Sequence, residues 1–437
     1  MSAETLLRGG CVLTLGAKTA NHTAADVLIA DGMVAEVGAG LRARDAEVVD
    51  ATDTIVMPGF VDTHRHVWRS LFRNLGEPGS GAEPPVSAVD LGEHYGAEDV
   101  YAATLIGLLG AVEAGITTVV DWCDLPLDDA SIDAALQAHA DAGLRTVFVN
   151  AGPRQADPAT RQRLTRLSGA AGSSTTIALG SELGGTDPGQ IAGDRELARD
   201  LGSPVHVHAG SRSPGAIAHL AERGLLDAEV TLVHCSGLDD GDLDRVASSK
   251  ARVSLAPSSE MASGLGSPPI QALIDRGIRP GLGVDDERVA PGDLFAQMRA
   301  TISLQHATVF ERKLAGKAGL PKLMSTRDVI RFATIEGARV VGLAALTGSI
   351  EPGKQADLVV LRTDRPNIFP INDPIGAVVW GMDTSNVDWV FAGGGVLLRD
   401  GVLQADVQRA RGMATTARQR VAAAAGLVPA AAPGGER

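Results

Sequence analysis

The stretch Met57-Pro-Gly-Phe-Val-Asp-Thr-His64-Arg-His66 closes a short apolar run. The run at residues 55–62 has the length and the β-branched content of a buried strand. Side chains alternate across a strand, so His64 and His66, two residues apart, project from the same face. Two imidazoles at one strand end can bind the same metal ion. The stretch therefore predicts a strand that ends in a pair of metal ligands.

Beyond this strand, short β-branched runs alternate with longer runs of helical period. Together with residues 55–62, the predicted strands are residues 117–123, 145–150, 176–180, 204–207, 230–233, 252–256 and 279–284. The helical runs include residues 98–114, 130–142, 190–201, 214–223, 268–276 and 327–342. Eight β/α alternations over roughly 290 residues suit a TIM barrel, which typically needs about 250. We expect an α/β fold built on a (β/α)8 barrel, with a doubly wound open sheet as the alternative.

The two ends of the chain differ from the middle, because both contain short β-type runs separated by Gly and Asp turn signals. The first set lies at residues 6–15, 26–30, 34–37 and 47–49, and the second at residues 357–361, 377–379, 387–392 and 396–399. Each set predicts a small β-meander. The barrel then occupies residues 57–347 between β-segments 1–56 and 348–403. Residues 404–437 predict a helix followed by a mobile tail.

The composition excludes several classes of protein. The chain has 437 residues, of which 44% are hydrophobic and 21% charged, so it can bury a large core. Its formal net charge of -14 opposes sequence-independent binding to a nucleic-acid polymer. The longest apolar stretches, such as residues 102–112, are too short for a membrane span, and residues 1–30 lack the pattern of a signal peptide. We expect a cytoplasmic protein with neither a membrane nor a nucleic-acid polymer as partner.

The cysteines indicate which side chains could hold a metal ion. Cys11, Cys123 and Cys235 are scattered without a paired spacing. Neither a disulfide framework nor a cysteine zinc site is therefore predicted. Any metal ion in this protein would have to be bound by histidines and carboxylates.

Enzymes with a TIM barrel place their reactive residues at the carboxyl ends of the strands. The fifth predicted strand runs on through His206 and His208, the sixth is followed by His234, and the eighth by Asp285 and Asp286. A histidine of the fifth strand and a carboxylate after the eighth would complete a nitrogen-rich site with one oxygen ligand. Such a set suits zinc or iron better than magnesium, and an open position for water makes the site catalytic.

Taken in order, these segments resemble the amidohydrolase superfamily. The closer resemblance is to its cytosine deaminase-like branch, which holds triazine hydrolases and guanine and S-adenosylhomocysteine deaminases. The stretch quoted first, with Leu71-Phe-Arg73 after it, is similar to the first-strand signature of that branch. The later segments that resemble it are Gly115-Ile-Thr-Thr-Val-Val-Asp121, Pro204-Val-His-Val-His208, Val233-His234-Cys235, Gly281-Leu-Gly-Val-Asp285 and Gly348-Ser-Ile-Glu-Pro-Gly-Lys-Gln-Ala-Asp357.

The resemblance implies both an architecture and a chemistry. Segments 1–56 and 348–403 would form one composite β-sandwich beside the barrel, and the protein would be a homo-oligomer, as similar enzymes usually are. The implied ligands of one divalent ion, Zn²⁺ or alternatively Fe²⁺, are His64, His66, His208 and Asp285. The ion would activate a water, Asp285 would accept the proton of that water, and His234 would polarise the group under attack. The expected reaction is hydrolysis of a C–N bond in a small cyclic nitrogen-containing substrate, usually with release of ammonia.

The sequence departs from the branch at one position with a chemical role. Deaminases of this branch carry a Glu three residues after the fifth-strand His, and this chain has Ser211 there, next to the expected substrate. A serine cannot act as acid and base at neutral pH. Two other interpretations therefore remain open within the fold: a cyclic amide hydrolase, or a lyase, isomerase or cyclase of specialised metabolism. A catalytically inactive paralogue that binds a ligand is the alternative of another class.

Several other side chains near the predicted strand ends are candidates for the site. Glu182 ends the fourth strand and Glu260 follows the seventh, where the branch usually has His and Asn. We expect one of them to transfer protons in place of the missing Glu or to bind a cationic group, although either could be an exposed loop acid. Glu182 could instead bridge a second metal ion. The expected substrate contacts are Trp68, Arg73 and Trp122, with the two indoles stacked on a flat ring or forming an apolar wall.

Overall fold

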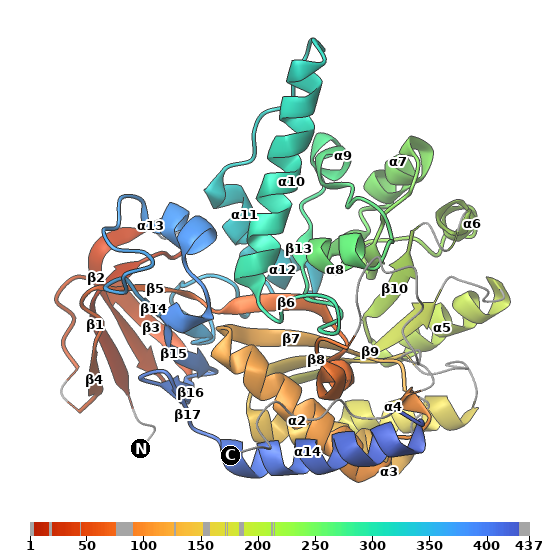
Figure 1. The fold of residues 1–437 in the computed structure, drawn as a ribbon, viewed down its shortest axis with the longest axis horizontal. Helices are drawn as coiled ribbons and strands as arrows, with labels where there is room; N and C mark the ends of the chain where they lie inside the picture. Colours follow the sequence, from red (N-terminus) through yellow and green to blue (C-terminus); the bar gives the residue numbers. More distant parts are fainter. Residues whose placement is uncertain are drawn as a thin grey trace, which may run out of the picture.

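The structure is a computed structural model that describes residues 4–16, 20–43, 45–75, 91–125, 128–151, 158–170, 172, 174–182, 188–210, 213 and 215–427. Its strands form two sheets, one of eight strands and one of nine. The two sheets lie side by side, with the helices gathered around the eight-stranded one (Figure 1).

The eight-stranded sheet is a barrel of parallel strands in sequence order. Its members are β6 (Phe60–Arg65), β7 (Ile116–Cys123), β8 (Arg145–Asn150), β9 (Thr175–Glu182), β10 (Val205–Ala209), β11 (Val230–His234), β12 (Arg252–Leu255) and β13 (Gly281–Leu282). The barrel closes because the backbone N–H of Asp285 donates to His64 O over 2.8 Å, and that of His66 donates to Asp285 O over 3.0 Å. The predicted TIM barrel is confirmed, and the open doubly wound sheet is wrong.

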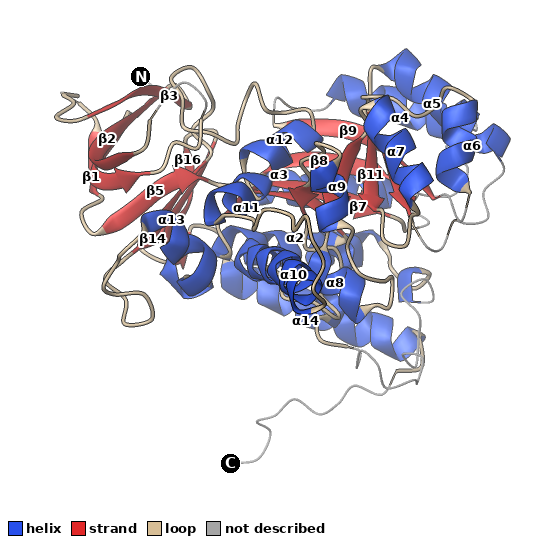
Figure 2. Ribbon diagram, turned by 90° about the horizontal axis from the view of Figure 1, so that it is seen from above, coloured by secondary structure: helices blue, strands red, loops and turns tan. Residues whose placement is uncertain are grey.

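Helices cover the outside of this barrel (Figure 2). They are α2 (Ala97–Glu113), α3 (Asp129–Ala142), α4 (Pro158–Ala170), α5 (Pro188–Leu201), α6 (Ala216–Glu222), α7 (Asp240–Ser249), α8 (Pro257–Ala262), α9 (Ile270–Asp275), α10 (Leu294–Leu314), α11 (Thr326–Phe332) and α12 (Ile335–Val340). The single helix predicted at residues 327–342 is wrong. It is divided into α11 and α12, because Thr334 has φ -134° and ψ -102°, outside the helical region.

The nine-stranded sheet joins the two ends of the chain. It contains β1 (Thr5–Val12), β2 (His22–Ala30), β3 (Met33–Gly38), β4 (Glu47–Asp50), β5 (Thr54–Pro58), β14 (Leu358–Arg362), β15 (Val387–Ala392), β16 (Gly395–Arg399) and β17 (Val402–Leu403). Antiparallel pairing of β5 with β14 connects the N-terminal strands to the C-terminal ones. All nine strands belong to one continuous sheet, which encloses a core of its own that includes Val27, Val56, Leu358 and Phe391.

The strand predicted at residues 377–379 is wrong, because this segment is helical. Asp373 accepts hydrogen bonds from the backbone N–H groups of Ile375 and Gly376, and Pro374 occupies the first helical position. This N-terminal cap starts the short helix α13 (Pro374–Gly376), which continues as the π-helix η2 (Ala377–Gly381). The apolar residues Val378 and Val379 are buried from a helix instead of a strand.

The strand predicted at residues 55–62 divides at Gly59, and this division carries the chain from one sheet to the other. The backbone N–H of Gly59 donates to Asp357 O over 3.0 Å, next to β14. A Cβ atom at Gly59 would lie 2.1 Å from Thr117 Cγ2, so only glycine fits here. The strand β5 stays in the nine-stranded sheet, while β6 enters the barrel and carries its histidine pair to the mouth.

The C-terminal helix α14 (Val407–Ala424) packs along α2 (Figure 1). Its buried residues include Ala417 and Val421, and Arg420 Nε donates to Asp99 Oδ1 over 2.9 Å. Residues 428–437, where the sequence predicts a mobile tail, lie outside the described residues. Among the helices that the structure describes, none combines the length and the apolar content that a membrane crossing requires.

Candidate metal and catalytic site

A cavity of about 410 Å³ opens at the carboxyl ends of the barrel strands. Charged and polar side chains dominate its lining, which consists of His66, Arg69, Asp124, His208, Ala209, Gly210, Ser213, His234, Ser236, Ser263, Leu265, Asp285, Asp286 and Arg288. The residues come from the ends of several strands and from the loops after them. This is the position at which TIM-barrel enzymes bind their substrates.

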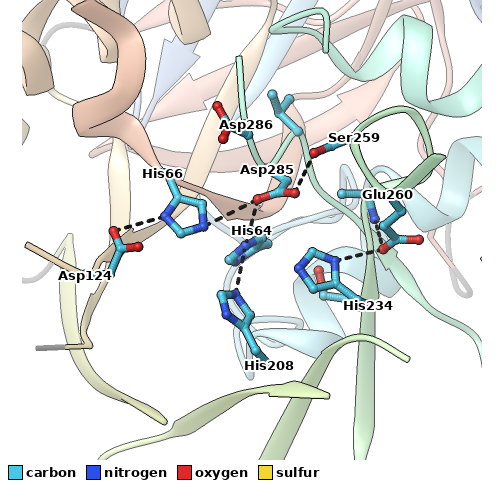
Figure 3. Close-up of polar contacts among 12 residues, drawn as sticks. His64, His66, Asp124, His208, His234, Ser259, Glu260, Asp285 and Asp286 are labelled. Carbon is cyan, nitrogen blue, oxygen red and sulfur yellow. Dashed lines mark hydrogen bonds and ion pairs between the residues drawn. The ribbon is translucent and has the colours of Figure 1, made fainter. Parts of the chain in front are cut away.

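Three imidazoles and one carboxylate converge at the floor of this cavity (Figure 3). Asp285 Oδ1 lies 3.2 Å from His64 Nε2 and 3.4 Å from His66 Nε2. His208 Nε2 faces His64 Nε2 over 3.2 Å. Three imidazole nitrogens and one carboxylate oxygen, joined by these contacts, fit the donor set of a catalytic zinc ion. The structure thus brings together all four ligands that the resemblance implies.

The environment keeps two of these donors, His64 and Asp285, in their ligating forms. Burial lowers the pKa of His64 well below its usual value, despite the contact with Asp285, so this imidazole is neutral. Burial opposes ionisation of Asp285, but the hydrogen bond with His64 and the nearby His234 and His66 hold its pKa well below the usual range. Neutral imidazoles and an ionised carboxylate are the species that bind a divalent cation.

A second layer of hydrogen bonds orients these ligands, and the sequence did not reveal it. Asp124 Oδ1 lies 3.2 Å from His66 Nδ1 and accepts a bond from Trp68 Nε1 over 2.6 Å. Arg69 Nη2 donates to the other oxygen, Asp124 Oδ2, over 2.8 Å. On the opposite side, Ser259 Oγ donates to Asp285 Oδ2 over 2.6 Å. The only sequence signal for Asp124 is its position directly after the end of β7.

We expect Asp124→Asn to weaken metal binding by about 10–100-fold, the usual effect of losing such an outer carboxylate. The variant removes the anionic partner of His66 and one of the carboxylates that hold Arg69. Competition with a chromogenic chelator would measure the affinity for zinc. Asp133→Asn is a suitable control, because Asp133 pairs with Arg166 on the exposed surface. An affinity equal to that of the parent protein would contradict a supporting role for Asp124.

His234 lies beside these four side chains with one ring nitrogen turned away from them. Its Nδ1 is 3.1 Å from Glu260 Oε1, and its imidazole is one of a group of potential ligand atoms with His64 and His208 that lie within 4.8 Å of one another. Glu260 is fully buried and also accepts bonds from the backbone N–H of Ala256 over 2.8 Å and from Ser236 Oγ over 3.3 Å. A carboxylate at Nδ1 fixes the proton there and leaves Nε2 as an acceptor facing the floor of the cavity (Figure 3).

This position corrects the expected role of Glu260. The carboxylate does not project into the mouth, and it does not belong to the lining of the cavity among the described residues. It lies behind His234 because α8 begins immediately after β12 and turns Glu260 back onto the end of β11. Glu260 therefore acts through His234, as a positioning residue.

Three non-glycine residues of the site have a left-handed backbone. The φ angles are 78° at His234, 59° at Cys235 and 64° at Asp285. Each such conformation costs of the order of 1–3 kcal/mol and is found preferentially at active sites and ligand clamps. The packing of the barrel therefore holds these side chains in place against a local energetic preference.

Trp68 and Trp122, the expected aromatic contacts to substrate, do not line the cavity. Trp122 is fully buried and stacks on the His208 ring with 3.9 Å between ring centroids, so it supports a ligand. Trp68 is also buried and is bound to Asp124. Among the described residues that line the cavity, the only aromatic rings are imidazoles.

The remaining candidates have the following positions. Arg73 lies away from the mouth, because its Nε donates to Glu287 Oε1 over 2.7 Å, and it lines a separate cavity beside α14. His206 lies two residues before His208 on β10 and is fully buried. Burial lowers its pKa to about 3, as suits a core position. Glu182 ends β9 in register with His208. The side chain of Glu182 and the whole of Ser211 lie outside the described residues.

A closed (β/α)8 barrel whose mouth gathers three imidazoles and a carboxylate defines a metal-dependent hydrolase. Residues 55–397 match the model of the Amidohydrolase family, so the chain belongs to that family. It is a metal-dependent hydrolase of C–N bonds from the deaminase-like branch of the amidohydrolases.

Similar proteins of known activity cover almost the whole chain. It is 29% identical over 407 residues to a 5'-deoxyadenosine deaminase of Methanothermobacter thermautotrophicus, covering 86% of this chain and 90% of that protein. It is 27% identical to a 5-methylthioadenosine/S-adenosylhomocysteine deaminase of Symbiobacterium thermophilum, covering 90% and 93%.

Solved structures share the fold. Atrazine chlorohydrolase of Arthrobacter aurescens TC1, complexed with zinc, superimposes with a TM-score of 0.83 at 21% identity and covers 95% of this chain and 100% of that one. An adenosine deaminase of Xanthomonas campestris with bound zinc has a TM-score of 0.81 at 21% identity and covers 96% and 99%. Because both structures cover nearly the whole chain, the likeness includes the barrel and the nine-stranded sheet beside it.

Proposed function

We propose that this enzyme binds one Zn²⁺ ion at His64, His66, His208 and Asp285 and releases ammonia from a small cyclic amidine. Adenosine derivatives are the first substrates to test, since the relatives named above deaminate such compounds. The observation that carries the proposal is that His64 Nε2 and His66 Nε2 both face Asp285 Oδ1, over 3.2 and 3.4 Å, while His208 Nε2 faces His64 Nε2 over 3.2 Å. Fe²⁺ is the alternative ion, because imidazole ligands accept it as well.

When bound, the ion supplies a water of lowered pKa and an electrophile for the substrate. The protein provides the proton transfers. Asp285 has its Oδ2 engaged by Ser259, which directs Oδ1 to the ligand cluster, where it can accept the proton of the attacking water. His234 holds its own proton on Nδ1 against Glu260, so its Nε2 can take up the proton that the attacking water gives to Asp285 and then donate it to the leaving amine. The balanced reaction consumes one water, forms a C–O bond, breaks a C–N bond and yields ammonia.

The pair of His234 and Glu260 takes the place of the fifth-strand Glu in this proposal. Ser211 occupies the position of that Glu and cannot carry a proton at neutral pH. A buried carboxylate faces Nδ1 of His234, which favours a single tautomer of the imidazole. In this proposal the two proton carriers of the site are Asp285 and His234.

Opening of a cyclic amide is the second candidate, and the presence of Ser211 favours it. Ring opening leaves the amine attached to the product and needs less assistance to a departing group. The polar lining, with Ser213, Ser236, Ser263 and Arg288, suits a substrate with several hydrogen-bonding groups. Release of free ammonia distinguishes deamination from ring opening, in which the product is the substrate plus one water.

We expect the purified, unsupplemented protein to contain close to one zinc or iron per chain by elemental analysis. Treatment with a chelator should lower ammonia release from 5'-deoxyadenosine, 5'-methylthioadenosine or S-adenosylhomocysteine by at least about 100-fold, and added Zn²⁺ should restore it. A variant with both His64 and His66 changed to alanine is the matched control that no zinc should rescue. Two ions per chain would favour a bridging Glu182 and amide hydrolysis. If the protein binds no ion after incubation with zinc, the proposal fails and the catalytically inactive ligand-binding paralogue becomes the better interpretation.

A further inference from the structure

Three consecutive acidic residues follow β13, and each of them contacts β6 or the 3-10 helix η1 (Val67–Phe72) after it. Asp285 faces the two ligand histidines of β6. Asp286 Oδ2 accepts a bond from Arg69 Nη1 over 2.8 Å. Glu287 Oε1 lies 3.0 Å from Arg65 Nη2, and Oε2 accepts a bond from Ser70 Oγ over 2.8 Å. The segment that bears the only carboxylate of the proposed ligand set is thus attached to the strand that bears two of the histidines.

Arg65 is central to this attachment. It stands between the ligands His64 and His66 in the sequence, and its side chain is fully buried. Its Nη1 donates to Asp62 Oδ2 over 3.2 Å, and its Nη2 reaches Glu287 and the carbonyl oxygen of Gly292. Asp62 Oδ1 in turn accepts from the backbone N–H of Val284, the residue before Asp285, over 3.0 Å. Arg65 and Asp62 therefore hold the segment after β13 at Val284, before Asp285, and at Glu287, after it.

The backbone around Asp285 has little strand pairing beyond the two hydrogen bonds that close the barrel. The strand β13 has just two residues, Gly281 and Leu282, and pairs with β12 at two positions. Toward β6, the recorded pairing is the single bridge between Arg65 and Asp285. The Asp285 backbone is also left-handed, with φ 64°. Side-chain ion pairs must therefore help to fix the position of the Asp285 segment, which longer strand pairing fixes elsewhere in the barrel.

We propose that Arg65 and Arg69, acting on Glu287 and Asp286, form a clamp that positions Asp285 against His64 and His66 and thereby sets the affinity for the metal ion. The inference rests on the proposed metal site. All four clamp residues are positioning residues, because the geometry assigns the ligand contacts to Asp285 and the histidines. Arg69 extends the clamp to Asp124, the partner of His66, so it connects the supports of two ligands.

Glu287→Gln tests the clamp, because it keeps the shape of the side chain and removes its charge. We expect zinc affinity to fall by about 10–100-fold in chelator competition, as when the support of a ligand is lost. The control is Asp357→Asn, since Asp357 is equally buried and pairs with Arg145 over 2.9 Å at the junction with the nine-stranded sheet. Both variants remove an anionic partner of a buried arginine and should lower the melting temperature, but only Glu287→Gln should change the zinc affinity.

Arg69→Lys provides an independent variant if Glu287→Gln does not fold. A lysine keeps the positive charge but cannot bridge Asp124 and Asp286 with two nitrogens, so a smaller loss of zinc affinity is expected. Parent-like zinc affinity in every folded clamp variant would overturn the clamp while leaving the proposed function intact. Equal losses in the clamp variants and in Asp357→Asn would also overturn it, because the effect would then be general destabilisation. Absence of zinc binding by the parent protein would instead contradict the proposed function itself.

Discussion

Replacing Asp285 by asparagine is expected to lower kcat by roughly 10²–10⁴-fold, the range in which general acid–base catalysis contributes. Asp285 is the only anionic member of the proposed ligand set, and its Oδ1 contacts both His64 and His66. An asparagine of the same shape can neither neutralise a cation nor accept the proton of the attacking water. Steady-state kinetics with the best substrate from the adenosine-derivative panel would measure the effect.

Zinc titration separates the two roles of Asp285. If saturating zinc restores the activity of Asp285→Asn, the carboxylate serves only as a ligand; if the variant binds zinc and stays inactive, the carboxylate is also the proton acceptor. Asp244→Asn is the control, since Asp244 pairs with Arg276 on the exposed surface of α7. Retention of more than about a tenth of the parent kcat without added zinc would be incompatible with either role.

The second large effect is expected at the pair of His234 and Glu260. His234→Asn should lower kcat by about 100-fold or more, since it removes the proposed proton carrier to the leaving amine. Asparagine is preferred to alanine here, because it tolerates the left-handed backbone at φ 78°. Glu260→Gln should lower kcat by about tenfold with little change in KM, because a neutral amide oxygen accepts the Nδ1 proton of His234 more weakly than a carboxylate and orients the ring less firmly. The double variant should be no slower than His234→Asn, as expected for residues that act as a unit.

A nitrogen NMR measurement distinguishes positioning by Glu260 from a purely structural role. In the parent protein, His234 should exist as the tautomer with the proton on Nδ1, and Glu260→Ala should shift it toward a mixture. Glu336→Gln is the matched control, since Glu336 is a buried carboxylate of α12 that pairs with Arg331 of α11. An unchanged His234 tautomer in Glu260→Ala, or an equal loss of kcat in Glu336→Gln, would refute the role of Glu260.

The barrel and the histidines of its mouth could be predicted from local pattern. The strand period of two places His64 and His66 on one face, and the alternation of β-branched and helical runs determines the number and the order of the strands. These features depend on neighbours in the sequence, so they can be recognised before any contact is known. Local pattern failed where capping chemistry overrides it, as at Asp373, which turns the β-branched run after it into a helix.

The support of the site could not be predicted, because it depends on distances between segments far apart in the chain. Asp124 and His66 are 58 positions apart, and Arg69 and Asp286 are 217 positions apart. Each of these side chains, read alone, is an ordinary charged residue near the end of a strand. The same holds for Glu260, whose sequence position suggested the mouth and whose helix turns it behind His234.

The sequence by itself determined the class of fold, the residue types of the proposed metal site and the presence of Ser211 where similar deaminases carry a Glu. Only the tertiary structure decided that Trp122 supports a ligand, that Glu260 supports His234 and that Arg65 holds the acidic segment of Asp285. The reason is physical. Strand period and strand order are local properties of the chain, whereas the orientation of a ligand is fixed by hydrogen bonds and ion pairs that form only when the barrel closes.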